Sequence, residues 1–309
     1  MGYLVEGQWC HADQLTPSGV AYQKASSRFV GEVSRAVAEL RQSSADESGY
    51  IEALRAYFSR FTLFASLACP WVHRVLLARA LGPVGEALRC RWISGEFGEE
   101  GWRLPLELHP LTGRPPYVHS LYTHTHPQHT GRVTLPLLWD HQEERLVSND
   151  SGELMRALGG SLLAPPDELQ ELDLEAAWLQ SELNIAPYRA GFASTQAHYE
   201  QAVLGLFQVL DQLEERLERG EAFLRGAQLS ELDLRLLPTL VRFDIAYVTH
   251  FKCNLKRLVD YPALSAYLRR LCVIPAVRET IDLDEVKLHY FKSVPKNDHV
   301  PLGPPVDFL

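Results

Sequence analysis

Cys69 stands where a helix is predicted to begin. It is followed directly by Pro70, and residues 72–81 carry apolar side chains at helical spacing until Gly82-Pro83 ends the run. Proline is favoured in the first turn of a helix because its missing N–H has no partner to lose there. Cys69 is therefore expected at the N-cap, where free backbone N–H groups and the helix dipole favour a thiolate over a thiol. The sequence predicts a nucleophilic sulfur at this position.

No second thiol lies close to Cys69 in the sequence. A dithiol oxidoreductase has a cysteine three positions further on, and here that position is Val72. A mixed disulfide on Cys69 would then need an external thiol to resolve it, and glutathione is the expected co-substrate. The histidine and asparagine signature of a papain-like protease is also missing around Cys69. The other four cysteines are expected to be buried small apolar residues, as free cysteines usually are: Cys10, Cys90, Cys253 and Cys272.

Two further segments have residue types that could hold a peptide beside such a cysteine. Pro136 lies inside a predicted strand, a position that proline occupies at a sheet edge or in a cis turn. In thioredoxin-like folds a cis-proline lies opposite the active cysteine, so the backbone of Leu135 would face an extended peptide. At the start of the next helix, Asp150 could bind an amino group, and free N–H groups at Ser151 suit a carboxylate. Together these residues would hold a γ-glutamyl tripeptide, although most Asp-Ser pairs before helices are only caps.

The elements that must position these residues form an α/β pattern of thioredoxin type. Short apolar runs indicate strands, and the segments after Cys69 and Asp150 have helical periodicity. The order is strand, helix, strand, hairpin and helix, over residues 61–67, 72–81, 89–94, 133–148 and 151–158. Residues 95–130 are rich in Gly, Pro and His and are expected to form a loop. Residues 1–60 are interpreted as an N-terminal extension with one helix near 29–40 and a polar loop at 43–49.

The second half of the chain is predicted to be helical. After a Pro-containing linker at 164–166, apolar residues recur at three- and four-residue steps, as in packed helices. The expected helices cover residues 168–183, 196–219, 231–247 and 262–271. Ser230-x-x-Asp233 resembles a capping box, and Pro238 predicts a kink. The predicted organisation is an extension (1–60), a thioredoxin-like domain (61–160) and an all-α helical domain with its C-terminal tail (167–309).

Composition and charge narrow the classes of function. The chain has 309 residues, a net charge of −9 and a pI near 5.7, so nucleic-acid binding is disfavoured. No apolar run is long enough to span a membrane, and the first residues lack the pattern of a secretory signal. We therefore expect a cytoplasmic protein with reduced thiols. Four histidines lie in the 95–130 region without a neighbouring cysteine or an intervening carboxylate, so no metal site is expected: His119, His124, His126 and His129.

Several strings of residues resemble a known family, the glutathionyl-hydroquinone reductases, which form the Xi class of glutathione transferases. The strings are Cys69–Arg74, Gly131–Asp140, Val147–Ser151, Tyr188–Ala193, Leu240–Asp244 and His250–Leu255. The resemblance covers residues 61–304 and implies a glutathione transferase fold and a homodimer. It also implies that Cys69 takes the glutathionyl group from a glutathionyl-hydroquinone, and that a second glutathione then releases it as oxidised glutathione.

The resemblance also assigns the remaining site residues. Trp102 matches a tryptophan that lines the glutathione site, and three tyrosines match those of the aromatic substrate site: Tyr188, Tyr247 and Tyr290. Each tyrosine could equally be a packing aromatic. The sequence departs from the family at Leu135, Asp150, Pro187 and Phe291, where the family commonly has Val, Glu, an ordinary residue and Tyr. Two alternatives stay open: a general glutathione thioltransferase or dehydroascorbate reductase, and a glutathione-fold binding protein without turnover.

Overall fold

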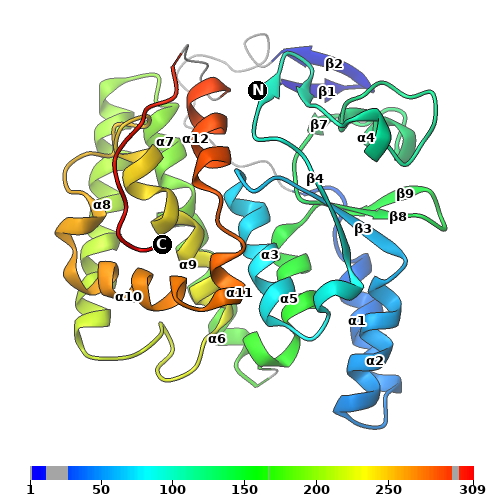
Figure 1. Cartoon of the computed structure of the whole chain (residues 1–309), viewed down its shortest axis with the longest axis horizontal. Helices are drawn as coiled ribbons and strands as arrows, with labels where there is room; N and C mark the ends of the chain where they lie inside the picture. Colours follow the sequence, from blue (N-terminus) through cyan, green and yellow to red (C-terminus); the bar gives the residue numbers. More distant parts are fainter. Residues whose placement is uncertain (1, 12–26, 166, 294–298) are drawn as a thin grey trace. The chain divides into compact units, whose positions relative to one another are not determined.

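The computed structural model describes residues 2–11, 27–165, 167–293 and 299–309. These residues form two compact units (Figure 1). The first unit contains the described residues of 1–16, 25–160 and 282–298, and the second contains those of 161–281 and 299–309. The expected fold class is therefore confirmed as a mixed α/β unit and a helical unit. The contacts place residues 282–293 with the α/β unit, whereas the predicted domain boundaries group them with the helices.

A four-stranded sheet forms the core of the first unit. Its strand order is β4-β3-β8-β9, with β3 and β4 parallel and the other neighbours antiparallel. The strands are β3 (Phe61–Ala65), β4 (Arg89–Trp92), β8 (Leu137–Asp140) and β9 (Arg145–Ser148). All five residues of β3 are buried, which explains why its sequence is an apolar run rather than an alternating one. This central strand leads directly to Cys69.

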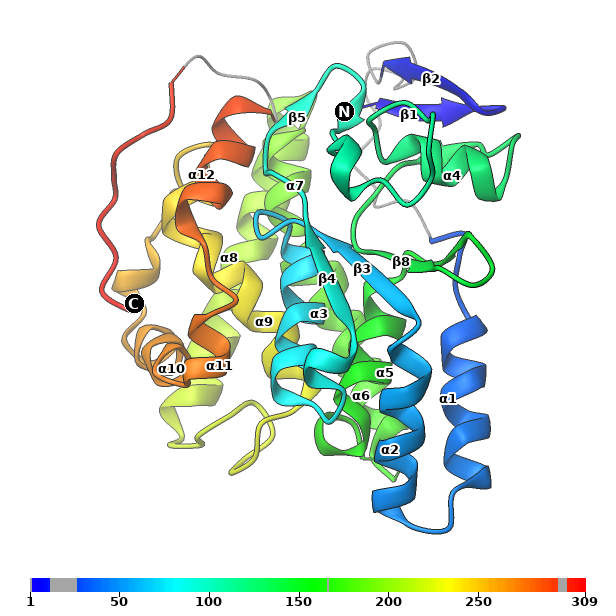
Figure 2. The ribbon, with the colours of Figure 1, turned by 45° about the vertical axis from the view of Figure 1, so that its right-hand side comes forward.

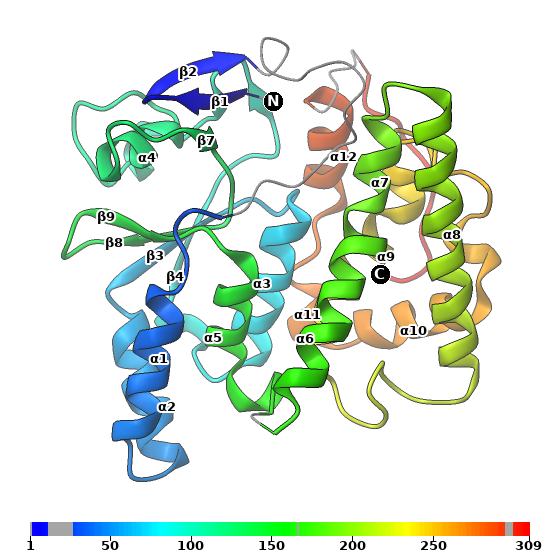
Figure 3. The same cartoon turned by 180° about the vertical axis from the view of Figure 1, so that it is seen from behind.

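Two helices complete the thioredoxin pattern. Helix α3 (Pro70–Leu81) connects β3 to β4, with the turn η2 (Gly85–Ala87) in between, and helix α5 (Ser151–Leu163) follows β9. The two helices lie side by side (Figures 1 and 3). A Cβ on Gly82 would lie 2.2 Å from the carbonyl oxygen of Leu158, so only glycine allows α3 to end this close to α5. The α5 backbone leaves helical geometry at Gly160, where φ is +60°.

The N-terminal segment contains more regular structure than the sequence predicted. Strands β1 (Gly2–Val5), β2 (Gln8–His11) and β7 (Gly131–Arg132) form a second sheet in the order β2-β1-β7, with antiparallel neighbours. Helix α1 (Glu32–Ser43) matches the expected helix, but α2 (Glu47–Phe58) begins inside the stretch predicted to be a loop. The Asp46 side chain accepts a hydrogen bond from the backbone N–H of Gly49, and this N-cap starts α2. Figure 1 shows α1 and α2 side by side.

The region predicted as a loop between β4 and β8 also contains short elements. They are η3 (Leu106–Leu108), the hairpin of β5 (Phe97–Gly98) and β6 (Gly101–Trp102), and helix α4 (His119–Thr125). The expectation of a loop was wrong for α4, whose residues Leu121 and Tyr122 are fully buried. Figure 2 shows the β1–β2 hairpin beside α4, and the rings of Trp9 and His119 stack there with centroids 5.1 Å apart.

The second unit is helical. It contains the four helices predicted for this part of the chain, together with shorter ones that were not predicted. They are α6 (Leu169–Trp178), η4 (Leu179–Asn184), α7 (Ala186–Gly191), α8 (Gln196–Glu218), α9 (Glu231–Arg242), η5 (Phe243–Tyr247), η6 (Leu258–Asp260), α10 (Pro262–Cys272) and α11 (Pro275–Arg278). The capping box at Ser230 and Asp233 is confirmed. Asp233 also accepts hydrogen bonds from the N–H of Leu224 and the hydroxyl of Tyr267. Pro238 lies inside α9, and its carbonyl accepts a hydrogen bond from Arg242 Nη1.

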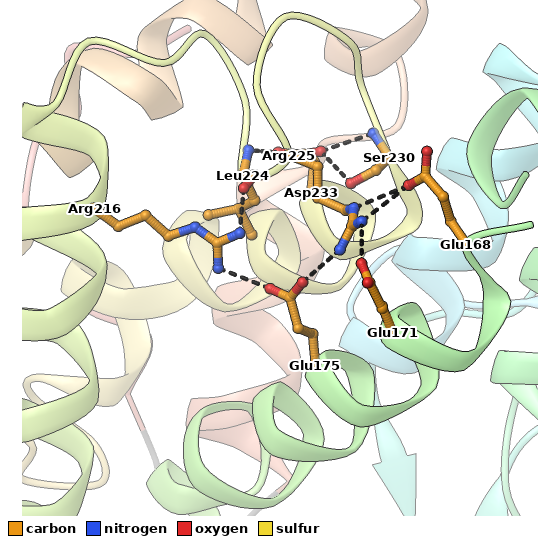
Figure 4. A network of polar contacts seen from close by, with 8 residues as sticks. All are labelled: Glu168, Glu171, Glu175, Arg216, Leu224, Arg225, Ser230 and Asp233. Carbon is orange, nitrogen blue, oxygen red and sulfur yellow. Dashed lines mark hydrogen bonds and ion pairs between the residues drawn. The ribbon is translucent and has the colours of Figure 1, made fainter.

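An ion-pair network holds the connection between α8 and α9 (Figure 4). Arg225 in this connection pairs with Glu168, Glu171 and Glu175, at 3.1, 2.9 and 2.6 Å. Arg216 on α8 pairs with the same Glu175 at 2.8 Å. Because Arg216 and Arg225 share carboxylates at residues 168–175, the network joins the α6 region to α8 and to the connection that follows α8.

Candidate active site

Cys69 is the N-cap residue of α3, as predicted. Pro70 occupies the first turn of the helix, and the Cys69 carbonyl accepts the first helical hydrogen bond, from the N–H of His73 at 2.9 Å. The backbone N–H of Cys69 donates to the carbonyl of Ser66 at 3.1 Å, which fixes the chain between β3 and α3. The residue is 6% exposed. The sulfur therefore lies at the positive end of the helix dipole in a place of restricted solvent access.

The strand opposite Cys69 begins with the predicted cis peptide bond. The Leu135–Pro136 bond is cis, and Pro136 directly precedes β8. The Cys69 Sγ lies 3.8 Å from the carbonyl oxygen of Leu135. The structure thus brings together Cys69, Leu135 and Pro136, which are more than sixty residues apart in the sequence. A ligand bound to the sulfur would meet the backbone of Leu135.

Asp150 and Ser151 form the start of α5. Asp150 Oδ1 accepts hydrogen bonds from the N–H groups of Gly152 and Glu153, at 2.9 and 2.8 Å. At least one carboxylate oxygen of Asp150 therefore caps the helix, which is the usual role of an Asp-Ser pair before a helix. The Asp150 N–H donates to Ser148 Oγ at 3.2 Å. The turn 148–151 is held by its own side chains before any ligand binds.

Arg74 joins this turn to the helix that carries Cys69. Its guanidinium donates through Nε and Nη2 to Ser151 Oγ, at 3.1 and 2.5 Å, and lies 5.2 Å from the ring centre of Trp71. Arg74 is only 4% exposed. Arg74 belongs to the Cys69–Arg74 string that resembles the family, but the sequence alone predicted no role for it. A buried cation beside the N-terminus of α5 adds to the preference of that end for a carboxylate.

Glu153 is a second residue that sequence reasoning missed. It is 7% exposed, and its Oε1 accepts from the N–H groups of Gly31 and Ser34 at 2.7 and 3.0 Å. Its Oε2 accepts from Ser148 Oγ at 2.6 Å. The spacing Asp150-x-x-Glu153 resembles a capping box. In the structure, however, the glutamate caps the N-terminus of α1 instead of its own helix.

Asn149 continues the same connection to the N-terminal segment. Its backbone N–H donates to the carbonyl of Phe29 at 3.1 Å, and its Oδ1 accepts from the Phe29 N–H at 3.3 Å. Its Nδ2 donates to the hydroxyl of Tyr122 at 3.1 Å. Residues 29–34 therefore bind along the turn that begins α5.

Trp102 lies in β6, in the first unit. It is 6% exposed, and its ring stacks on the imidazole of His289 with centroids 5.2 Å apart and planes 9° apart. Phe97, its cross-strand partner, meets it edge-on at 5.2 Å. His289 belongs to α12 (Leu283–Lys292), which also carries Tyr290. The Tyr290 side chain is fully buried.

The other two predicted tyrosines meet in the second unit. The rings of Tyr188 and Tyr247 lie 6.1 Å apart in an edge-on arrangement. Phe251 stacks on Tyr247 with planes 4° apart and centroids 5.8 Å apart. Gly191 makes this packing possible, because a Cβ there would lie 2.1 Å from the Phe251 ring. Two strings that were separate in the sequence, 188–193 and 250–255, thus form one aromatic cluster.

The other cysteines differ from Cys69 in their surroundings. Burial raises the pKa of Cys90 to about 11 and the pKa values of Cys253 and Cys272 to about 12. These thiols stay protonated at neutral pH. Cys253 and Cys272 are buried as expected, whereas Cys90 and Cys10 are half-buried.

The described part of the chain contains neither a candidate metal cluster nor a candidate membrane-spanning helix. No group of three or more His, Cys, Asp or Glu side chains in this part of the chain is arranged to hold a metal ion. No helix in the described ranges is long and apolar enough to cross a membrane.

Comparisons with known proteins agree with this geometry. Residues 196–270 match the family model described as "Glutathione S-transferase, C-terminal domain". The glutathionyl-hydroquinone reductase PcpF of Sphingobium chlorophenolicum is 38% identical, with 98% of this chain and 96% of PcpF covered. The glutathionyl-hydroquinone reductase YqjG of Escherichia coli K12 is 36% identical, over 95% of this chain and 91% of YqjG.

Solved structures give the same result. The glutathione-bound structure of Escherichia coli YqjG has a TM-score of 0.74 at 35% identity, covering 81% of this chain and 86% of that one. The Xi glutathione transferase of Phanerochaete chrysosporium has a TM-score of 0.73 at 36% identity, covering 79% of this chain and 90% of that one. The fold and these relatives define a glutathione transferase. The chain belongs to the Xi class of that superfamily, the family of the glutathionyl-hydroquinone reductases.

Proposed function

We propose that this protein removes glutathione from glutathionyl-hydroquinones, with Cys69 as the nucleophile. The observation that carries the proposal is the position of Cys69 at the N-cap of α3, 3.8 Å from the carbonyl that precedes cis-Pro136. The names and near-complete coverage of the relatives support the same reaction. Glutathione is a co-substrate, and the reaction needs no metal.

The reaction has two steps. In the first, the Cys69 thiolate attacks the sulfur of the glutathionyl substituent, so that an S–S bond forms and the bond between sulfur and the aromatic carbon breaks. The aromatic carbon takes the electron pair and a proton, and hydroquinone leaves. In the second, the thiolate of another glutathione attacks the glutathionyl sulfur of the mixed disulfide and releases the Cys69 thiolate. Overall, the aromatic carbon is reduced, and the glutathionyl thioether sulfur and one glutathione thiol become the disulfide of oxidised glutathione.

Four groups of the first unit hold the glutathionyl moiety in this proposal. The Leu135 backbone pairs with the peptide, and the N-terminus of α5 at Ser151 binds the γ-glutamyl carboxylate, assisted by the charge of Arg74. The carboxylate of Asp150 attracts the amino group, and Trp102 packs against the tripeptide. The hydrogen bonds that already fix this turn support the assignment, because a fixed site loses little entropy on binding.

In this proposal, tyrosine hydroxyls contact the aromatic ring of the substrate. By likeness to the family, Tyr188, Tyr247 and Tyr290 are assigned to the aromatic substrate, because phenolic O–H donors stabilise the charge that develops as the C–S bond breaks. The Tyr188–Tyr247 pair supports this assignment, because two hydroxyl-bearing rings already meet in one cluster. The departures at Pro187 and Phe291 change neighbours of this set and so bear on which hydroquinone fits best.

The decisive test uses glutathionyl-menadiol and free glutathione, with product analysis by chromatography. Wild-type protein is expected to yield menadiol and oxidised glutathione, and Cys69→Ser is expected to lose activity by about a thousandfold or more. Cys10→Ser serves as the matched control and should retain wild-type rates. Quenching early in the reaction should give a Cys69 peptide that carries glutathione by mass spectrometry.

Two other outcomes would replace the proposal. Rapid turnover of small disulfides or dehydroascorbate without release of menadiol would identify a general thioltransferase. Identical behaviour of wild type and Cys69→Ala in every assay would identify a binding protein. A cysteine at a proline-capped helix start argues against the second outcome, because that position serves reactivity and adds little to packing.

The assembly and location of the protein are part of the same proposal. By likeness to glutathione transferases, the active form is a homodimer in the cytoplasm, where reduced glutathione is available and thiols stay reduced. Light scattering of the purified protein at micromolar concentration should report twice the chain mass, and a single chain mass would reject the dimer.

A further inference from the structure

Two polar residues of α12 and the residue that caps its C-terminus bind the segment that leads to Trp102. Glu285, His289 and Ser293 are four positions apart, a spacing that places side chains in a line along a helix. The N–H of Gly95 donates to Glu285 Oε2, and His289 Nδ1 donates to the Gly95 carbonyl at 2.8 Å. The N–H of Phe97 donates to Ser293 Oγ at 2.7 Å. Both backbone groups of Gly95 are thus bound by one helix.

Gly95 allows this contact because it has no side chain. A Cβ at this position would lie 2.6 Å from the carbonyl oxygen of Glu285 and 3.0 Å from the Cβ of Ala68. Ala68 immediately precedes Cys69. The segment at Gly95 is therefore packed between α12 and the residue that leads into the nucleophile, and no other residue type fits there without a shift.

His289 acts on Trp102 through two features of its ring. Its hydrogen bond to Gly95 fixes the orientation of the imidazole, and the face of the imidazole lies flat on the indole, 5.2 Å between centroids and 9° between planes. The indole is held at its edge by Phe97, whose own N–H is bound by Ser293. The plane of the Trp102 ring is thus fixed by α12. The hydrogen bond that anchors His289 joins it to Gly95, which is 194 positions earlier in the sequence.

We propose that His289 is a positioning residue for glutathione, which sets the plane of Trp102 against the tripeptide. This inference rests on the proposed function, because Trp102 is placed in the glutathione site by family resemblance. Tyr290, the next residue, is a proposed contact of the aromatic ring, and its ring meets His289 edge-on at 5.4 Å. One helix then orients a contact for glutathione and a contact for the hydroquinone.

The test separates the two features of the imidazole by substitution. His289→Asn keeps an N–H donor for Gly95 and removes the stacked ring, whereas His289→Phe keeps a flat ring and removes the donor. Asp284→Asn is the control, since Asp284 is an exposed residue of the same helix. Glutathione binding is measured by calorimetry in a Cys69→Ser background, and KM and kcat are measured with glutathionyl-menadiol in chains that keep Cys69.

We expect His289→Asn to weaken glutathione binding by about two- to tenfold, the size of one lost aromatic contact. His289→Phe should stay within about twofold of the parent, whereas His289→Asn should raise KM for glutathione more than it lowers kcat. In a double-mutant cycle, Trp102→Ala should abolish the effect of His289→Asn. Unchanged binding in His289→Asn, or independent effects of the two substitutions, would overturn the inference. Since calorimetry needs no turnover, failure of the wild type to release menadiol would overturn the proposed function alone.

Discussion

Two segments of the first unit, both assigned to glutathione, are held in place in different ways. The turn 148–153 is fixed by Asp150, Ser151 and Glu153, whose side chains accept hydrogen bonds from backbone N–H groups or from Arg74. The hairpin that carries Trp102 is fixed by α12, through half-buried side chains and one stacked ring. The first is a buried polar network, and the second is a contact between a helix and a loop.

The difference indicates what each segment contributes. Removing a buried carboxylate such as Glu153 leaves several buried hydrogen-bond donors without an acceptor, so the free energy of unfolding falls. The contacts around His289 and Ser293 lie nearer to solvent, and water can replace part of what is lost. We therefore expect the turn to be coupled to folding and the hairpin to be coupled to binding. Three substitutions test this distinction.

The largest effect is expected for Glu153→Ala. The substitution leaves the N–H groups of Gly31 and Ser34 and the hydroxyl of Ser148 without their acceptor. The free energy of unfolding should fall by roughly 3 kcal/mol, measured by urea denaturation. Glu285→Ala on α12 is the matched variant for the hairpin and should cost about 1 kcal/mol or less. Equal losses in the two variants would remove the distinction between the segments.

An intermediate effect is expected from acid. His129 packs between the rings of Phe29 and Tyr122 and is 2% exposed. Burial, with a smaller contribution from the charge of Arg28, lowers the pKa of His129 to about 4. The unfolded chain therefore binds a proton between pH 6.5 and 4 that the folded chain does not, so stability falls as pH is lowered through this window.

Replacing His129 by phenylalanine tests that assignment. His129→Phe removes the titrating group and keeps an aromatic ring, so the loss of stability between pH 6.5 and 4 should shrink by on the order of 2 kcal/mol. Urea midpoints at the two pH values measure the effect, and His299→Phe, at an exposed histidine, is the control. If the variant lost stability with falling pH as the wild type does, protonation of His129 would not be the cause of the acid sensitivity.

The smallest effect on stability is expected for Ser293→Ala. It removes one acceptor, for the N–H of Phe97, at the end of α12. The melting temperature should change little, since one half-buried hydrogen bond contributes about 1 kcal/mol or less. KM for glutathione should still rise by about twofold. A large fall in melting temperature with unchanged KM would show that the hairpin, like the turn, contributes to folding stability and not to glutathione binding.

The sequence predicted the parts of the site that depend on near neighbours. Pro70 placed Cys69 at a helix start, Pro136 indicated a cis bond, and the Ser230–Asp233 spacing indicated a capping box, because these signals act within three or four residues. The thioredoxin order of strands and helices followed from apolar patterning in the same way.

The missed features depend on residues that are distant in sequence. Arg74 and Ser151 are 77 positions apart, Glu153 and Gly31 are 122 apart, and Gly95 and His289 are 194 apart. No local pattern specifies such pairs, since packing of the whole unit brings them together. Helix α4 was missed for a related reason, because its buried residues Leu121 and Tyr122 stand among Gly, Pro and His residues that are typical of loops.

The glycine at position 191 has a practical consequence for redesign. Even a methyl group there would occupy the space of the Phe251 ring, so residue 191 cannot be varied unless residue 251 is made smaller first. Phe251 itself can be shortened without that conflict, and a leucine there would enlarge the space beside Tyr188 and Tyr247. Under the proposed function, in which Tyr188 and Tyr247 contact the aromatic substrate, a library for bulkier quinones should vary position 251 and leave 191 fixed.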